Sequence, residues 1–271
     1  MEEKKKVIVG VVIVIAVIVI AVGVYYFLLR EKPKEAVPAP VAAPAPVQPR
    51  VEEPVVKEKA PETIEVELNK SDELLRELTK GLSLSATFPS WMMTKNLIRK
   101  FVAATDNIAQ GMSPRSQVTF FSPKGRFKVV QKEDVFYVDS ADYARYNPAV
   151  EVFLSLDSKG CVDLYRKLKA PIQEAYKELG YPNRDFNKTL TLAIIELLKV
   201  PVVRGEIRLE ERVISYGLSD PKLEALSDAQ KHLLRMGPEN VLKVQLKLRE
   251  IATELGIAAN RIPRSRIYQA Q

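Results

Sequence analysis

The chain has 271 residues, with 41 Lys and Arg against 34 Asp and Glu, one cysteine and one histidine. The single Cys161 excludes an intrachain disulfide and a multi-cysteine metal site, and the single His232 excludes most zinc chemistry. Without the four basic and two acidic residues of 1–30, 37 basic and 32 acidic side chains remain, a mild surplus that does not indicate nucleic-acid binding. We expect no metal and no cofactor.

The first element is Val7–Leu29, a run of 23 residues without a charged side chain. About 20 apolar residues in a helix cross the hydrocarbon core of a bilayer. A cleaved signal peptide has a shorter apolar region of about 7–15 residues. The run therefore predicts a transmembrane helix that contacts the lipid bilayer through Val7–Leu29.

Basic residues flank both ends of this run, so the positive-inside rule does not decide its orientation. A short basic tail, one span and a long C-terminal part are typical of a signal anchor. We therefore expect a single-pass protein of the inner (cytoplasmic) membrane, with residues 1–6 in the cytoplasm and the rest periplasmic or otherwise extracytoplasmic. The reversed topology, with a cytoplasmic domain, is the alternative.

Residues 30–62 form a linker rich in proline and alanine, with eight prolines and no aromatic residue. Such a composition cannot bury enough apolar surface to offset the entropy lost on ordering. Proline favours the extended polyproline II conformation. The segment is predicted to be a disordered, semi-rigid spacer.

Helical periodicity and capping signals predict a mainly α (α+β) globular domain over residues 63–256, followed by a frayed basic C-terminal tail, 257–271. Pro171 is expected to kink the longest helix of the central part. The main predicted helices cover residues 71–80, 94–110, 157–179, 185–200, 227–236 and 238–255, with capping at Asp157, Asp185 or Asn187, Asp220, and Ser227 with Gln230.

The strand signals are concentrated in one region. Phe127, Val129 and Gln131 alternate with polar residues, and Val135–Val138 follows a turn, which predicts a hairpin. Val118–Phe121 is expected to add a third strand. Two further short strands are predicted at 206–209 and 212–216.

Four stretches carry a resemblance to a known family: FVAATDNIAQG (101–111), DYARYNPAV (142–150), PIQEAYKELGYP (171–182) and LSDPKLEALSDAQKHLLRMGPEN (218–240). They resemble a bacterial domain of unknown function whose members carry an N-terminal membrane anchor and a proline-rich linker. LLRMGPEN is its most specific signature. The resemblance implies a bacterial envelope protein, and it supplies no catalytic residues.

Three patterns resemble catalytic motifs. Ser219 and Lys222 match S-x-x-K, but the companion motifs of penicillin-recognising proteins are absent, and a helix cap explains the pattern better. Cys161 with His232 resembles a nucleophile–base pair, although Cys161 falls on an apolar helical stripe. Glu174 and Glu178 share a helix face, which suits acid–base work, but helix surfaces commonly carry such pairs beside lysines.

The candidate binding residues are tyrosines and arginines. Both types serve as anchors of binding surfaces, because they combine a large contact area with directed hydrogen-bond donors. The competing interpretation places the tyrosines in the core with their hydroxyl groups at its edge. The five candidates are Tyr143, Arg145, Tyr146, Tyr181 and Arg235.

The last helix has apolar residues at heptad spacing between Val241 and Leu255. This pattern suits a homo-oligomer contact, although two heptads fall short of a coiled coil and also suit packing on the domain's own core. The sequence as a whole favours a non-enzymatic binding module, held off the membrane to meet an envelope protein or cell-wall partner. An envelope hydrolase using the carboxylate pair and an oligomerising structural protein are the alternatives.

Overall fold

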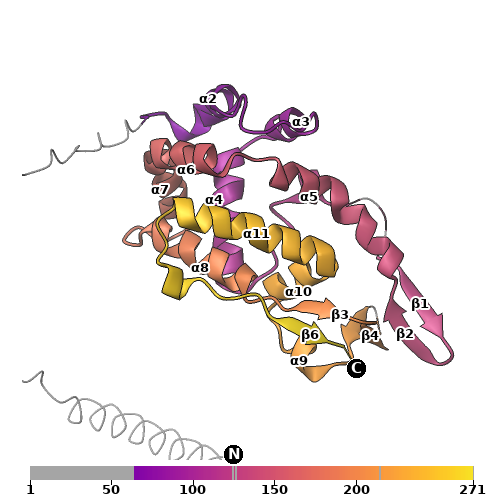
Figure 1. Cartoon of the computed structure of the whole chain (residues 1–271). Helices are drawn as coiled ribbons and strands as arrows, with labels where there is room; N and C mark the ends of the chain where they lie inside the picture. The colour runs from indigo at the N-terminus through magenta and orange to yellow at the C-terminus, as the bar shows by residue number, and fades with distance from the viewer. Residues whose placement is uncertain (1–63, 124, 126, 214, 271) are drawn as a thin grey trace, which may run out of the picture. The chain divides into compact units, whose positions relative to one another are not determined.

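The structure is a computed structural model that describes residues 64–123, 125, 127–213 and 215–270 (Figure 1). All of them belong to the unit Glu58–Gln271. The predicted transmembrane helix Val7–Leu29 and the predicted spacer 30–62 lie outside the described residues. Within the described ranges, no helix has both the length and the apolar character that a bilayer crossing requires.

The first described elements are η1 (Leu68–Lys70), α2 (Ser71–Leu78), α3 (Phe88–Met92) and α4 (Leu97–Ala109). Helix α4 begins later than its predicted start at Thr94, because Asn96 has a left-handed backbone with φ of 58°. The amides of Asn96 and Leu97 donate to the carboxylate of Asp72 on α2, at 2.7 and 3.0 Å. A carboxylate from another helix therefore satisfies the free N–H groups at the start of α4.

The predicted long helix between Asp157 and Leu179 is two helices, α6 (Ser158–Lys167) and α7 (Lys169–Glu178). Pro171 has no backbone N–H, so the carbonyl of Lys167 has no helical partner. The amide of Ile64 donates to that carbonyl at 2.9 Å. The chain thus breaks between the two helices instead of kinking at Pro171.

Four strands form an antiparallel sheet in the order β1-β2-β4-β5: β1 (Val129–Lys132), β2 (Val135–Val138), β4 (Arg208–Glu211) and β5 (Tyr216–Leu218). The predicted hairpin is confirmed, with Val130 opposite Tyr137. The strand predicted at Val118–Phe121 is wrong, because Thr119–Phe121 form the 3-10 helix η2. The rings of Phe120 and Phe121 pack on Trp91 of α3, with centroids 6.2 and 5.1 Å away.

The C-terminal residues do not fray as expected. They form η4 (Ala259–Arg261) and β6 (Ile267–Gln269), which pairs in parallel with β3 (Val202–Arg204). Arg249 donates to the carbonyl of Pro263 at 2.8 Å, and the Tyr268 hydroxyl donates to Asp220. Most of the predicted tail is therefore part of the fold.

The remaining helices are η3 (Ser140–Tyr146), α5 (Asn147–Leu154), α8 (Phe186–Leu198), α9 (Pro221–Glu224), α10 (Asp228–Leu234) and α11 (Pro238–Glu254). Four predicted capping residues are confirmed, because their side chains accept backbone N–H bonds at the starts of α6, α8, α9 and α10: Asp157, Asp185, Asp220 and Ser227. These local signals therefore determine where the four helices begin.

Helix α11 lies across the middle of the described domain, in contact with α5, α6 and α8 (Figure 1). Its apolar stripe, which includes Val241, Val244 and Leu248, is buried in the core that α11 shares with α8, α10 and β3. The same chain therefore covers the stripe considered for a homo-oligomer. A second core forms where α4, α7 and the start of α8 meet, around Tyr176 and Phe186.

Candidate functional site

Four of the five predicted binding residues lie together. Tyr143, Arg145 and Tyr146 are on η3, and Arg235 follows α10. The turn between α10 and α11 contacts η3 so closely that a Cβ on Gly237 would lie 2.4 Å from Cγ of Tyr143. Glycine is required there, and its φ is 85°. This close approach fixes η3 beside the end of α10.

A buried ion pair holds η3 in shape. Nη1 of Arg145 donates to the Asp142 carboxylate at 3.0 Å, and their side chains are only 13% and 7% exposed. Nη2 of Arg145 donates to the carbonyl of Gly125 at 2.7 Å, and the amide of Lys128 donates to Asp142 at 3.2 Å. Arg145 thus fastens the loop before β1 onto η3.

His232 lies on α10, three residues before Arg235. Its Nδ1 is 3.3 Å from the Ser113 hydroxyl oxygen, and the amide of Ala229 donates to the carbonyl of Gly111 at 3.0 Å. The loop after α4 therefore lies along α10. Burial lowers the pKa of His232, and the charges of Arg235 and Arg115 lower it further, so the ring is neutral at pH 7.

The charges of the same two arginines also act on Tyr146 of η3. Burial raises the pKa of its hydroxyl group, whereas the positive charges of Arg145, Arg235 and Arg115 act in the opposite direction. The guanidinium of Arg145 is 5.8 Å from the Tyr146 ring centroid. We call the surface formed by Arg115, Tyr143, Arg145, Tyr146, His232 and Arg235 the basic tyrosine face.

Arg115 and Arg235 are the uncompensated charges of this face. Both are exposed, and within the described residues neither guanidinium forms a salt bridge or a hydrogen bond. Asp142 is already paired with Arg145. The face therefore holds two positive charges without an acidic partner in the described part of the chain.

Sequence reasoning missed Arg115, although a signal was present. Residues 107–132 contain no Asp or Glu but five basic residues: Arg115, Lys124, Arg126, Lys128 and Lys132. An acid-free basic run of this length indicates a positively charged surface. The sequence offers His232 as the base of a pair with Cys161, and its position beside Arg115 follows from the fold.

The structure places Tyr181 elsewhere. Its ring stacks near Tyr176, with centroids 4.8 Å apart, and the Arg184 guanidinium is 4.9 Å from its centroid. Its hydroxyl group accepts from Gln110 at 3.1 Å and donates to Asp106 at 3.4 Å. Tyr181 thus closes the edge of the second core, with its hydroxyl group bonded there.

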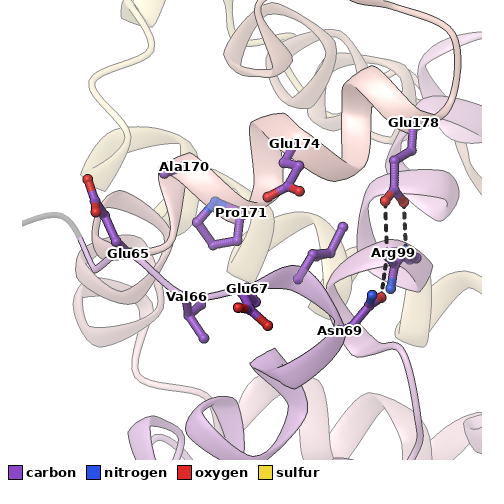
Figure 2. Close-up of a pocket in the computed structure, with 10 residues that line it drawn as sticks. Glu65, Val66, Glu67, Asn69, Arg99, Ala170, Pro171, Glu174 and Glu178 are labelled. Atoms are coloured by element: carbon purple, nitrogen blue, oxygen red, sulfur yellow. Dashed lines mark hydrogen bonds and ion pairs between the residues drawn. The ribbon is translucent and has the colours of Figure 1, made fainter.

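The predicted carboxylate pair lines a separate open cleft of about 640 Å³ between α7 and the segment before α2. Figure 2 shows the carboxylates of Glu174 and Glu178 on the same side of α7, with Arg99 facing Glu178. Arg99 donates to both oxygens of Glu178, at 2.6 and 2.9 Å, and also to Asn69 at 2.9 Å. This hydrogen bonding lowers the pKa of Glu178, opposite to what a general acid requires.

The other catalytic patterns have structural explanations. Asp220 caps α9 by accepting from the amide of Lys222 at 2.8 Å, and Pro221 is the first residue of that helix, which accounts for the S-x-x-K spacing. Burial raises the pKa of the half-buried Cys161 thiol, which disfavours a reactive thiolate. The described residues contain no cluster of side chains suited to a metal ion.

These observations define a helix-rich α+β domain with a small antiparallel sheet and a basic tyrosine face. The family model described as "Protein of unknown function (DUF3014)" matches residues 97–252, more than half of the chain. The chain therefore belongs to the DUF3014 family. The match runs from α4 to α11 and includes the basic tyrosine face. No curated protein and no solved structure matches the chain.

Proposed function

We propose that the chain is a membrane-anchored, non-enzymatic binding module of the bacterial envelope. Val7–Leu29 anchors it, the spacer 30–62 carries the domain away from the membrane, and the basic tyrosine face binds an envelope protein or a wall polymer. The observation that carries this proposal is the pair of exposed arginines, Arg115 and Arg235, without an acidic partner in the described residues.

The build of the face supports binding. The buried pair of Asp142 and Arg145 and the contact between Gly237 and Tyr143 hold η3 in one position. A surface that is rigid before binding loses less conformational entropy when a partner arrives. Tyrosine and arginine side chains then supply contact area and directed donors. Tyrosine and arginine side chains on an element that is held in one position are the arrangement that a binding module needs.

The hydrolase alternative has weaker support. Glu178 is held as an anion by Arg99, and Glu174 is exposed at the side of an open cleft. A pair that divides acid and base roles needs one carboxyl group with a raised pKa. The cleft offers a carboxylate with a lowered pKa instead.

Protease accessibility tests the location. Digestion of the domain in intact spheroplasts would support an extracytoplasmic domain, whereas protection until lysis would overturn that part of the proposal. Photocrosslinking in the same cells tests the face, with benzoylphenylalanine placed at Ser116, an exposed neighbour of Arg115, or, as a control, at Lys188, an exposed residue of α8. We expect a discrete adduct from position 116 only. Equal crosslinking from both positions would contradict the assignment of the face.

A further inference from the structure

The two uncompensated arginines of the basic tyrosine face both lie near His232, because the charge of each lowers the pKa of its ring. Ser113, two residues before Arg115, contacts His232, and its hydroxyl oxygen accepts from the Arg115 amide at 3.4 Å. Arg235 follows His232 by three residues, which places both on neighbouring positions of one helical surface. The Gly237 turn then brings Tyr146's helix alongside.

From this arrangement we infer that Arg115, Arg235 and the Tyr146 hydroxyl group bind a dianionic phosphoryl group carried by the partner. Guanidinium groups present planar pairs of donors that match phosphate oxygens. A phosphate monoester carries about −1.5 to −2 charges at pH 7, which balances two arginines, whereas a carboxylate balances one. The inference rests on the proposed function, because it names the group that the same face recognises.

The charge balance of the face supports this choice. Asp142, the acidic residue on η3, is neutralised by Arg145 at 3.0 Å. His232 adds no charge at pH 7, because burial and the two arginines lower its pKa. The remaining charge is that of Arg115 and Arg235. A bound dianion would remove the repulsion between them.

His232 provides a direct readout, because it is the only histidine of the chain and its ring resonance is unique. The full-length protein in a neutral detergent would be titrated between pH 5 and 8 with sodium phosphate or with sodium chloride of equal ionic strength. Bound phosphate should raise the His232 pKa by roughly half a pH unit or more, because a nearby negative charge favours the protonated ring. Chloride controls for screening.

Two variants make the test specific. Arg115→Gln with Arg235→Gln should raise the His232 pKa in the absence of phosphate and abolish its response to phosphate. Arg261→Gln with Arg264→Gln removes the same charge from exposed arginines after α11, and its response should equal that of the wild type. If the first double variant does not fold, the single Arg235→Gln variant should show a reduced phosphate response.

The source of the phosphoryl group is tested by replacing free phosphate with nanodiscs that contain phosphatidic acid or only neutral lipid. A shift of the His232 pKa with inorganic phosphate supports the inference and indicates that the phosphoryl group is soluble or carried by a polymer. A shift with phosphatidic acid alone supports the inference and indicates that the phosphoryl group belongs to a lipid. If the Arg115→Gln substitution shifts the His232 pKa but neither inorganic phosphate nor phosphatidic acid does, the inference is overturned. In that case an adduct from position 116 would still support the proposed binding function.

Discussion

Arg99 of α4 and Glu178 of α7 form a two-pronged ion pair, with Nε to Oε2 at 2.6 Å and Nη2 to Oε1 at 2.9 Å. The same guanidinium also donates to Asn69 of η1. Paired donors facing paired acceptors are the strongest form of this interaction. The pair therefore links η1, α4 and α7 and holds Glu178 in its ionised state.

Glu178→Gln should lower stability at neutral pH. The folded-state pKa of Glu178 lies below its ordinary value of 4.5. Its contribution is therefore present above pH 4.5 and is lost as the pH falls towards the folded pKa. Urea midpoints of wild type and variant should differ at pH 7, and the difference should shrink as the pH falls below 4.5. Glu174→Gln is the control, because Glu174 makes no ion pair or hydrogen bond within the described residues. Identical midpoints of wild type and Glu178→Gln at pH 7 would contradict the prediction.

Asp106→Asn should raise stability at pH 7. Burial raises the pKa of the Asp106 carboxyl group above its ordinary value of 3.8, against the opposing hydrogen bonds from Tyr181 and Gln110. The folded state thus binds the proton more tightly than the unfolded state does. The stability that this proton contributes is fully present below pH 3.8 and is lost as the pH rises through the folded pKa. Chemical unfolding at pH 7 and pH 3.5 should show a gain only at pH 7. The exposed Asp134→Asn should show none, and a loss at pH 7 for Asp106→Asn would reverse the assigned sign.

Gln245→Leu should destabilise the domain by about 1–3 kcal/mol, because it leaves buried polar groups without partners. Gln245 is 0% exposed in the core. Its Nε2 donates to the carbonyl of Val200 at 2.8 Å, and its Oε1 accepts from Ser265 at 2.9 Å. Equilibrium unfolding in urea measures the loss. Gln131→Leu on the exposed side of β1 should stay within about 0.5 kcal/mol, and a similarly small effect at position 245 would show that the network is dispensable.

Gly237→Ala and Gly256→Ala are compared next. Both glycines have positive φ values, 85° and 76°, but only Gly237 faces a side chain, that of Tyr143. A conformational penalty of about 1–3 kcal/mol applies to a side chain at such a φ, and it is larger at Gly237, whose ψ of 162° lies in a region essentially restricted to glycine. Gly237→Ala should cost more and should shift the His232 resonance, because it displaces η3 from α10. Equal unfolding free energies and an unchanged resonance would mean that Tyr143 moves away without consequence.

Local signals in the sequence predicted much of the secondary structure. Asp157, Asp185, Asp220 and Ser227 cap the helices for which they were assigned, because a cap depends on residues within one turn. The hairpin at Val129–Val138 also follows from local alternation. These features needed no knowledge of the rest of the chain.

The errors arise where distant residues decide the outcome. The start of α4 depends on Asp72, 24 residues before Asn96, and η2 replaces a strand because its phenylalanines pack on Trp91. Likewise, Arg115 joins the candidate face only because the loop after α4 lies along α10. Four of the five candidate residues are adjacent, whereas Tyr181 belongs to another core, and sequence spacing could not separate them.

The hydrogen bond from Ile64 to Lys167 has a mechanical consequence. A pull on the chain ahead of Ile64 would reach the domain first through this single bond, and next through η1, where Leu68 is buried in the second core. Bonds loaded one at a time peel at lower force than strands sheared together. Tension on this end should therefore detach the segment before α2 and open the cleft beside Glu174, while α8 and α11 stay folded.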